Sequence, residues 1–480
     1  MKFLLSHFWV FYVFFSSAQS VVDISNGTRL PAKTSKFKII GKNNDGIVVR
    51  LYGSEDVINV YDNSLRLITN KTIDYKNKDG LLQHIMLNKS GAMIFYLEQQ
   101  KKFSVLLAQP VNSKYIEIGK PLSIDTIFDR KELIASNLRF KASLDQSCLL
   151  IYYPYFSEDK VQSVKFICVD RGLRTLYNKT IPLNRDEKEL EESKSVIDNN
   201  GNSFLILKPE NNGQGNVYDV QHIDSKGDFL NYRITTTREV FGEPSFDIDN
   251  KNGNMVMTAF YDDRLRPNEH LANGFLYASF NPANGTSVHS TYTSFSKDFI
   301  AELTGRENIT NQSLYTFTIR KAVLRNDGGI LIAAESFIKD SRDQAVPLGV
   351  QPGYNSYRST EIFQFNDIIA FSINSKGTLE WHSVMRKKQA SEDDNGIYSS
   401  FMLMNEKEKL RFIYLDDIST NSSVYNYYLS SEGMTDKDVL LNQEERDLML
   451  MPKMGKQISP EEVAIPSYKN GSLRLVKITF

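Results

Sequence analysis

Short apolar runs recur along the whole chain and carry its clearest structural signal. They are rich in Ile, Val, Tyr and Phe, which suit a pleated, buried surface, and they are too short to be typical helices. Several are continuous rather than alternating, which predicts strands that are covered on both faces. Examples are residues 46–53, 92–99, 148–156, 204–208, 255–261 and 330–337.

Turns rich in Asn, Asp and Gly recur before these runs. Such residues tolerate the positive φ angles of tight hairpins, so each turn predicts a pair of antiparallel strands. The eight turns are residues 44–46, 88–91, 143–146, 198–201, 250–253, 326–329, 405–408 and 469–471. Around the first turn the pattern predicts strands at 37–41, 47–52, 57–62 and 65–73. Around the second it predicts strands at 83–87, 92–97, 103–108 and 115–124.

Four antiparallel strands per unit, repeated along the chain, predict an all-β fold, a β-propeller of seven or eight four-stranded blades. The last unit supplies only two predicted strands, 463–467 and 473–480, so we expect residues 21–35 to close the ring with them. The alternative is an outer-membrane β-barrel, whose strands alternate apolar and polar residues. Runs such as 149–153 and 331–334 do not alternate, which favours the propeller.

The first residues have the layout of a secretory signal peptide. Lys2 precedes an apolar run over 3–15, and Ser16, Ser17 and Ala18 provide small residues for cleavage after Ala18. The apolar run is shorter than the ~20 residues that span a bilayer. We therefore expect residues 1–18 to be removed and residues 19–480 to form one exported propeller domain, in the periplasm, on the cell surface or outside the cell.

The charge balance bears on nucleic-acid binding, and the two cysteines bear on a possible disulfide. The 57 Lys and Arg residues nearly balance the 58 Asp and Glu residues, which gives no indication of a nucleic-acid surface. The two cysteines, Cys148 and Cys168, flank a predicted hairpin centred near residue 158, so they are expected to lie directly opposite each other. A disulfide between them and two buried free thiols both remain open.

One segment carries a family resemblance. Residues 326–337, NDGGILIAAESF, are followed by NDIIAFSINSKGTLEW at 366–381. This pair resembles the repeat unit of uncharacterised secreted bacterial β-propeller-like proteins, in which a DGGxLxA strand precedes a hairpin that ends in Trp. The resemblance implies the fold, and it implies no catalytic residues.

Sequence motifs for known catalytic chemistry are missing. The chain has no G-x-S-x-G elbow, P-loop, H-E-x-x-H or C-x-x-C pattern, so we expect no metal and no cofactor. Glu335 and Asp367 interrupt apolar strands and are the carboxylates to consider, because a buried carboxylate needs a partner or a shifted pKa. We expect both to lie at strand ends and to reach solvent.

Three long insertions, 262–273, 296–313 and 339–360, are predicted to lie on one face of the ring, opposite the short turns. Residues 296–313 predict a short helix that Ser296 caps and Gly305 ends. Long loops in compact domains are often functional. The predicted ligand-binding residues are Asp262, Asp263, Arg264, Arg266, Glu269, His270, Arg342, Asp343, Tyr354, Tyr357 and Arg358.

Two functions fit this sequence pattern. The first is a non-catalytic binding or scaffold propeller for a glycan, a peptide or an envelope protein. The second is a glycan-active hydrolase or lyase that uses carboxylates on the loop-rich face, because glycoside hydrolysis typically needs two carboxyl groups. The fold alone does not discriminate between them.

Overall fold

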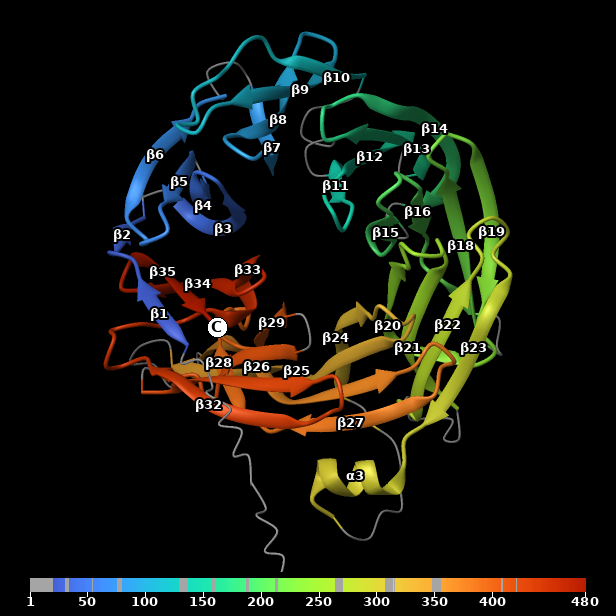
Figure 1. The fold of residues 1–480 in the computed structure, drawn as a ribbon, viewed down its shortest axis with the longest axis vertical. Helices are drawn as coiled ribbons and strands as arrows, with labels where there is room; N and C mark the ends of the chain where they lie inside the picture. Colours follow the sequence, from blue (N-terminus) through green and yellow to red (C-terminus); the bar gives the residue numbers. More distant parts are fainter. Residues whose placement is uncertain are drawn as a thin grey trace, which may run out of the picture.

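Eight antiparallel sheets stand in a ring in the computed structural model of this protein (Figure 1). The structure describes residues 20–30, 34–53, 55–75, 80–128, 137–157, 160–186, 190–211, 215–263, 271–306, 314, 316–347, 355–406, 409–419 and 421–480. The predicted all-β propeller is therefore confirmed, with eight blades. The separate sheets exclude the single closed sheet that was the alternative architecture.

The first four blades follow one another along the chain. Their strands are, for blade 1, β3 (Thr34–Asn43), β4 (Gly46–Gly53), β5 (Asp56–Tyr61) and β6 (Leu67–Ile73); for blade 2, β7 (Gly80–Leu87), β8 (Ala92–Gln99), β9 (Ser104–Val111) and β10 (Leu122–Ile127); for blade 3, β11 (Arg139–Ala142), β12 (Cys148–Ser157), β13 (Lys160–Asp170) and β14 (Thr175–Asp186); and for blade 4, β15 (Lys194–Ile197), β16 (Ser203–Ile206), β18 (Asn216–Ile223) and β19 (Phe229–Thr235), with the short β17 (Glu210–Asn211) beside β18.

The second half of the chain adds larger blades and completes the ring. The elements are, for blade 5, β20 (Glu239–Ile248), β21 (Met255–Asp262), β22 (Gly274–Phe280) and β23 (Ser287–Ser294); then α3 (Lys297–Thr304); for blade 6, β24 (Phe317–Leu324), β25 (Ile330–Pro347), β26 (Asn355–Ile373) and β27 (Leu379–Met385), with β28 (Gln389–Glu392) beside β26; for blade 7, β29 (Phe401–Glu406), β30 (Lys409–Leu415), β31 (Ser423–Ser430) and β32 (Thr435–Asn442); then the 3-10 helix η2 (Pro452–Met454); and for blade 8, β33 (Lys456–Ser459), β34 (Glu462–Lys469), β35 (Ser472–Thr479) and β1 (Val21–Ile24), with β2 (Thr28–Arg29) beside β35.

Strands from both ends of the chain close the ring. β1 pairs antiparallel with β35 and becomes the fourth strand of blade 8. The prediction that residues 21–35 complement the last unit was correct over β1 and β2, whereas Thr34 already begins blade 1. The prediction of two strands for the last unit was wrong, because this unit contributes three, β33, β34 and β35. The turn at 469–471 joins β34 to β35, the second and third strands of the blade, rather than the first and second.

The first strand of each blade lies nearest the centre of the ring (Figure 1). The turns between first and second strands lie on one face, which we call the turn face. The connections between second and third strands, and between successive blades, lie on the opposite face, which we call the connection face. This division follows from the up-and-down order of antiparallel strands.

The Asn- and Asp-rich turns do more than permit a tight bend, because neighbouring blades touch through them. The Asp45 carboxylate accepts hydrogen bonds from Ser90 and from the backbone N–H of Gly91, the latter at 2.6 Å. The side chain of Asn250 accepts the backbone N–H of Asn199 at 2.8 Å in the same way. The recurring polar turns therefore tie adjacent blades together along the turn face.

Apolar side chains fill the spaces between adjacent blades. In β21 every residue is buried, as the continuous apolar run predicted, because a blade is covered on both faces by its neighbours. One core cluster joins blades 2 and 3 through Phe95, Leu106, Ile151 and Ile167. The outermost strands, such as β6 and β19, alternate little and are mostly exposed.

The second half of the chain carries the predicted short helix. In α3 the Ser296 hydroxyl accepts the backbone N–H of Phe299, and Gly305 ends the helix at φ +69°, so the predicted caps are confirmed. Phe299, Ile300 and Leu303 are buried against blades 5 and 6, and the helix lies outside the ring beside β27 (Figure 1).

Residues 339–360 do not form the long loop that was expected. β25 and β26 remain paired from Ile330–Ile373 out to Pro347–Asn355, so most of this insertion is a two-stranded extension of blade 6. Within the described residues, no helix is both long and apolar enough to cross a bilayer. The predicted signal peptide, residues 1–18, lies outside the described residues.

Candidate functional site

Six of the eleven residues predicted from the long insertions are described, and they lie at the end of β21 and on β25 and β26. Asp262 is buried, and Asp263 forms an ion pair with Arg238 at 2.6 Å, whose guanidinium lies 4.8 Å from the centre of the Tyr261 ring. These contacts hold the edge of blade 5 together. Arg264, Arg266, Glu269, His270 and Tyr354 lie outside the described residues.

The remaining predicted residues lie on the extension of blade 6. Arg342 and Asp343 are exposed on β25. Tyr357 and Arg358 belong to β26 and are paired with Ala345 and Gln344. Ala272, in the first insertion, forms a β-bridge with Leu314, which directly follows the second insertion, with backbone hydrogen bonds of 2.7 and 2.8 Å.

Glu335 is completely buried, which overturns the expectation that it reaches solvent. Its side chain has 0% exposure and lies 2.8 Å from the ammonium of Lys387, which is also fully buried. Arg320 lies 3.1 Å from the same carboxylate, and Ser400 donates a hydrogen bond of 2.7 Å to it. Asp367 differs, because it pairs with Arg386 at 2.8 Å and its side chain keeps 25% exposure. The Glu335 cluster is a network of two ion pairs and a hydrogen bond around a buried carboxylate, where blades 6 and 7 meet.

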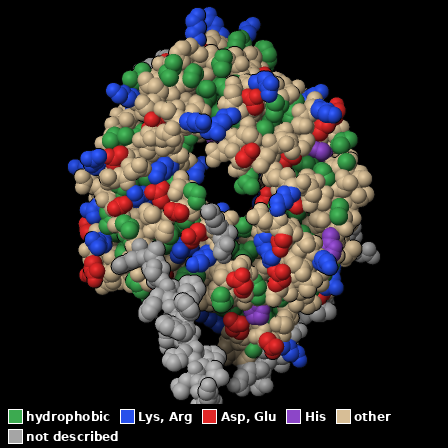
Figure 2. All heavy atoms as spheres, viewed as in Figure 1, with side chains coloured by type: hydrophobic (Ala, Val, Ile, Leu, Met, Phe, Trp, Pro, Cys, Tyr) green, Lys and Arg blue, Asp and Glu red, His purple; other side chains and the backbone are tan. Residues whose placement is uncertain are grey.

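A cavity lined by basic residues lies toward the turn face, where the inner strands of blades 8, 1, 2 and 3 meet. It has a volume of about 600 Å³, and we call it the basic pocket. Figure 2 shows the opening at the middle of the ring. No Asp or Glu belongs to the described lining. Its cationic residues are Lys38, Lys42, Arg50, Lys89, Arg171 and Lys456.

Only two of these cations have carboxylate partners, and both partners lie outside the lining. Lys42 pairs with Glu462 at 2.6 Å, and Arg50 pairs with Asp56 at 2.7 Å. The other four form no ion pair with any described residue; they are Lys38, Lys89, Arg171 and Lys456. The pocket therefore presents positive charge that no carboxylate among the described residues neutralises by an ion pair.

The pKa values of Lys456 and His84, which line the basic pocket, are both lowered, as expected beside a cluster of positive charges. Burial in the walls, followed by the nearby charge of Lys38, lowers the pKa of Lys456. Burial also lowers the pKa of His84 to about 4, and the charges of Lys38, Arg50 and Lys456 act in the same direction. The His84 ring stacks on Phe140 at 4.8 Å, so its faces are held in the wall of the pocket.

The pH dependence of stability should report the state of His84. The unfolded chain protonates His84 near its ordinary pKa of 6.5, whereas the folded chain does so only near 4. The unfolded state therefore binds more protons in this window, and stability is lost as the pH falls from about 6.5 to 4. We expect His84→Phe to remove up to about 3 kcal/mol of this loss.

The measurement is urea unfolding of both chains at several pH values. Because all other titrating groups are shared, the difference between the two curves isolates His84. Parallel curves between pH 6.5 and 4 would contradict a neutral, desolvated His84.

Sequence reasoning overlooked the basic pocket, although a signal for it existed. The inner strands of blades 8, 1, 2 and 3 contain no Asp or Glu, whereas the inner strand of blade 5 contains three and no Lys or Arg. The basic residues of those four strands are Lys36, Lys38, Lys42, Arg139, Lys141 and Lys456. Whole-chain charge balance concealed this segregation.

Cys148 borders the basic pocket, and the predicted register of the cysteines was wrong by two residues. Leu150 opposes Cys168 and Asp170 opposes Cys148, in part because a bulge beside Tyr155 shifts the register. The two cysteine side chains still lie close together, as predicted. Both thiols are free and buried on the same face of the sheet, 3.7 and 3.5 Å from where a Cβ on Gly201 would lie. Burial raises the pKa of both, to about 12 for Cys168.

Comparisons with known proteins add little beyond the architecture. No family model matches the sequence, and no curated protein matches it either. Among solved structures, the polysaccharide lyase Uly1 is similar at 7% identity over 83% of this chain and 89% of that chain, with a TM-score of 0.38. The uncharacterized protein lmo1340 from Listeria monocytogenes EGD-e is similar at 9% identity over 82% and 93%, also with a TM-score of 0.38.

A third similar structure is prolyl oligopeptidase B from Galerina marginata, at 7% identity over 93% of this chain and 55% of that chain, with a TM-score of 0.40. Similarity at this level carries no argument about activity. The description of this chain as an eight-bladed β-propeller rests on its own sheets.

Proposed function

We propose that this protein is a binding protein that takes an anionic oligomer, such as an acidic oligosaccharide, into the basic pocket. The observation that carries the proposal is the set of four cations that form no ion pair with a described residue, around a cavity whose described lining holds no carboxylate; of these four, Lys456 donates a hydrogen bond to the carbonyl of Ile40. Export of the protein, as the first residues suggest, is part of the same proposal.

The size of the basic pocket favours an oligomer over a single inorganic ion. Its volume of about 600 Å³ lies within the range of about 300–1,000 Å³ that is usual for sites of small organic ligands. Lysine ammonium groups and an arginine guanidinium bind carboxylate, sulfate or phosphate groups through charge-assisted hydrogen bonds. Lys38 and Lys456 come from adjacent blades, so one ligand can contact both.

Binding is favoured over hydrolysis by the composition of the lining. A glycosidase of the usual kind needs two carboxyl groups on either side of the scissile bond, and the described lining supplies none. The carboxylates Asp45 and Asp145, on nearby turns, accept hydrogen bonds from their own turns or from the next one. Both carboxylates therefore stabilise the turns.

The test is calorimetric titration with three oligosaccharides of equal length, one carboxylated, one sulfated and one neutral. The first two arms distinguish the anionic groups. We expect binding of at least one anionic ligand, no binding of the neutral one, and an affinity that falls as salt rises. Lys38→Glu and Lys456→Glu should each weaken binding by about tenfold or more, because each reverses a charge beside the ligand.

The matched control is Lys226→Glu, which makes the same charge change on an exposed turn of blade 4, outside the basic pocket. Equal losses in Lys226→Glu and Lys38→Glu would show that only net charge matters and would refute a defined site. Release of new reducing or unsaturated sugar ends during the titration would contradict a non-catalytic binding protein and would support a glycan-active hydrolase or lyase.

A further inference from the structure

A second cavity lies between blades 4 and 5, toward the connection face. It has a volume of about 230 Å³ and exists because β20 leaves the sheet there. Between the pairs Phe241–Phe260 and Ser245–Thr258, three residues of β20 face a single residue of β21. Gly242 adopts φ +71° at this bulge, in the left-handed region that glycine tolerates best. Bulges often re-aim side chains beside binding sites.

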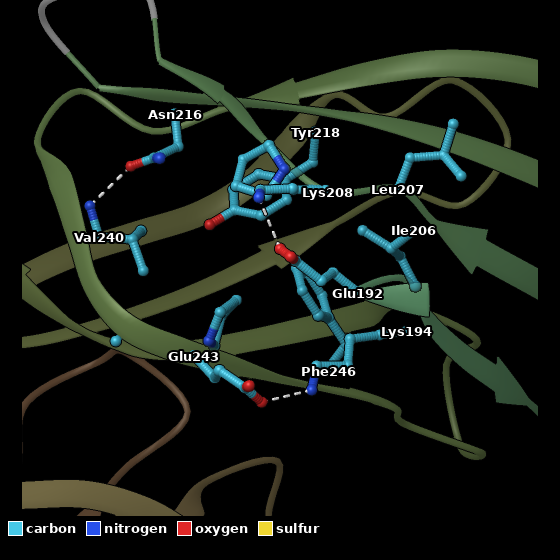
Figure 3. A pocket seen from close by; sticks show the side chains of 13 residues that line it. Glu192, Lys194, Ile206, Leu207, Lys208, Asn216, Tyr218, Val240, Glu243 and Phe246 are labelled. Atoms are coloured by element: carbon cyan, nitrogen blue, oxygen red, sulfur yellow. Dashed lines mark hydrogen bonds and ion pairs between the residues drawn. The ribbon is translucent and has the colours of Figure 1, made fainter. Parts of the chain in front are cut away.

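The walls of this cavity are mainly apolar, with one unusual polar atom. Ile206, Leu207, Val240 and Phe246 contribute apolar surface. The Tyr218 side chain is only 1% exposed, yet its hydroxyl has no hydrogen-bond partner among the described residues. In Figure 3 the Tyr218 ring lies among these side chains, between Val240 and the Lys208–Glu192 pair. Since buried tyrosine hydroxyls usually find a partner, this one keeps an unused capacity to form a hydrogen bond.

Two ion pairs form the rim of the cavity. Lys208 pairs with Glu192 at 2.7 Å, and Lys194 pairs with Glu243 at 2.6 Å (Figure 3). All four side chains are more than a third exposed, so each pair contributes little to stability. The rim can therefore exchange these partners for the charges of a ligand. It offers cations for a carboxylate and carboxylates for an ammonium group.

We infer that this cavity binds a free amino acid with an aromatic side chain that carries a polar end, such as tyrosine. The apolar walls take the ring, the Tyr218 hydroxyl takes the polar end, and the rim takes the zwitterionic head. A cavity of this volume, below the range usual for drug-sized ligands, fits a molecule of that size. A sugar fits less well, because apolar walls would leave several of its hydroxyl groups unpaired.

The experiment compares tyrosine, phenylalanine, p-cresol and glucose as ligands in a nuclear magnetic resonance titration. We expect tyrosine to bind most tightly. Tyr218→Phe should weaken tyrosine binding by about tenfold and leave phenylalanine unchanged, because one hydrogen bond is lost. The variant should fold as well as the natural chain, since the hydroxyl it removes has no hydrogen-bond partner in the described part of the chain. Val240→Phe should fill the cavity and abolish binding while the melting temperature holds or rises.

The contradicting outcomes are equally specific. Absence of saturable tyrosine binding, or equal tyrosine affinity in Tyr218→Phe, would overturn the inference. If p-cresol binds as tightly as tyrosine, or glucose binds better, the amino-acid assignment is wrong. Lys38→Glu should not affect tyrosine binding, so this test fails or succeeds independently of the basic pocket.

Discussion

Replacing Glu335 with Ala should lower the free energy of unfolding by about 3–5 kcal/mol, the usual loss when one partner of a buried ion pair is removed. The reason is that the amine of Lys387 would be left at 0% exposure without the carboxylate that stabilises its charged form. Arg320 would also lose its partner at 3.1 Å. Urea unfolding followed by tyrosine fluorescence measures the change.

Two further variants separate charge burial from packing. Glu361→Ala removes a carboxylate from the same blade, where it pairs with Lys339 at half-exposed positions, and should change stability little. Glu335→Leu combined with Lys387→Met removes both buried charges and should recover most of the loss. A free energy of unfolding for Glu335→Ala within about 1 kcal/mol of the natural chain would contradict a stabilising role for the buried Glu335–Lys387 pair.

A chain that begins at residue 31 should be less stable by at least about 3 kcal/mol, because it loses β1 and the partly buried Val22 and Ile24. The Ser25 hydroxyl accepts a hydrogen bond of 2.8 Å from the backbone N–H of Leu475, and the deletion would remove this acceptor. The shortened chain exposes the edge of β35, so we also expect it to aggregate more readily. Thermal unfolding and light scattering measure the two effects.

Single substitutions on β1 provide the matched control. Val22→Asp places a charge against the core cluster of blades 7 and 8 and should reproduce much of the loss. Val21→Asp, one residue earlier, affects a side chain with 56% exposure and should be tolerated. A peptide of residues 20–30 added to the shortened chain should restore part of its stability. An unchanged unfolding midpoint in the shortened chain would contradict closure by β1.

Local chemistry in the sequence was enough to establish the strands, the hairpins and the repeat. Apolar runs must be covered on both faces, and Asn- and Gly-rich turns must reverse the chain, so the propeller and its closure from both ends could be predicted. The helix after Ser296 could also be predicted, because both of its caps are formed by residues close in sequence. These features depend on neighbours within a few positions along the chain.

The candidate sites depend on which blades become neighbours and on exact register, and only the tertiary structure decided these. The sequence placed Glu335 in an apolar strand, but its burial depends on Lys387, from the segment after β27, and on Ser400, just before blade 7. A bulge beside Tyr155 helps to shift the hairpin register, so that Leu150 rather than Cys148 lies directly opposite Cys168. The basic pocket gathers Lys38 and Lys456, which are 418 positions apart, because the ring brings blade 8 beside blade 1. Pairings between distant segments follow from how the blades close into a ring, and no local pattern of residues records them.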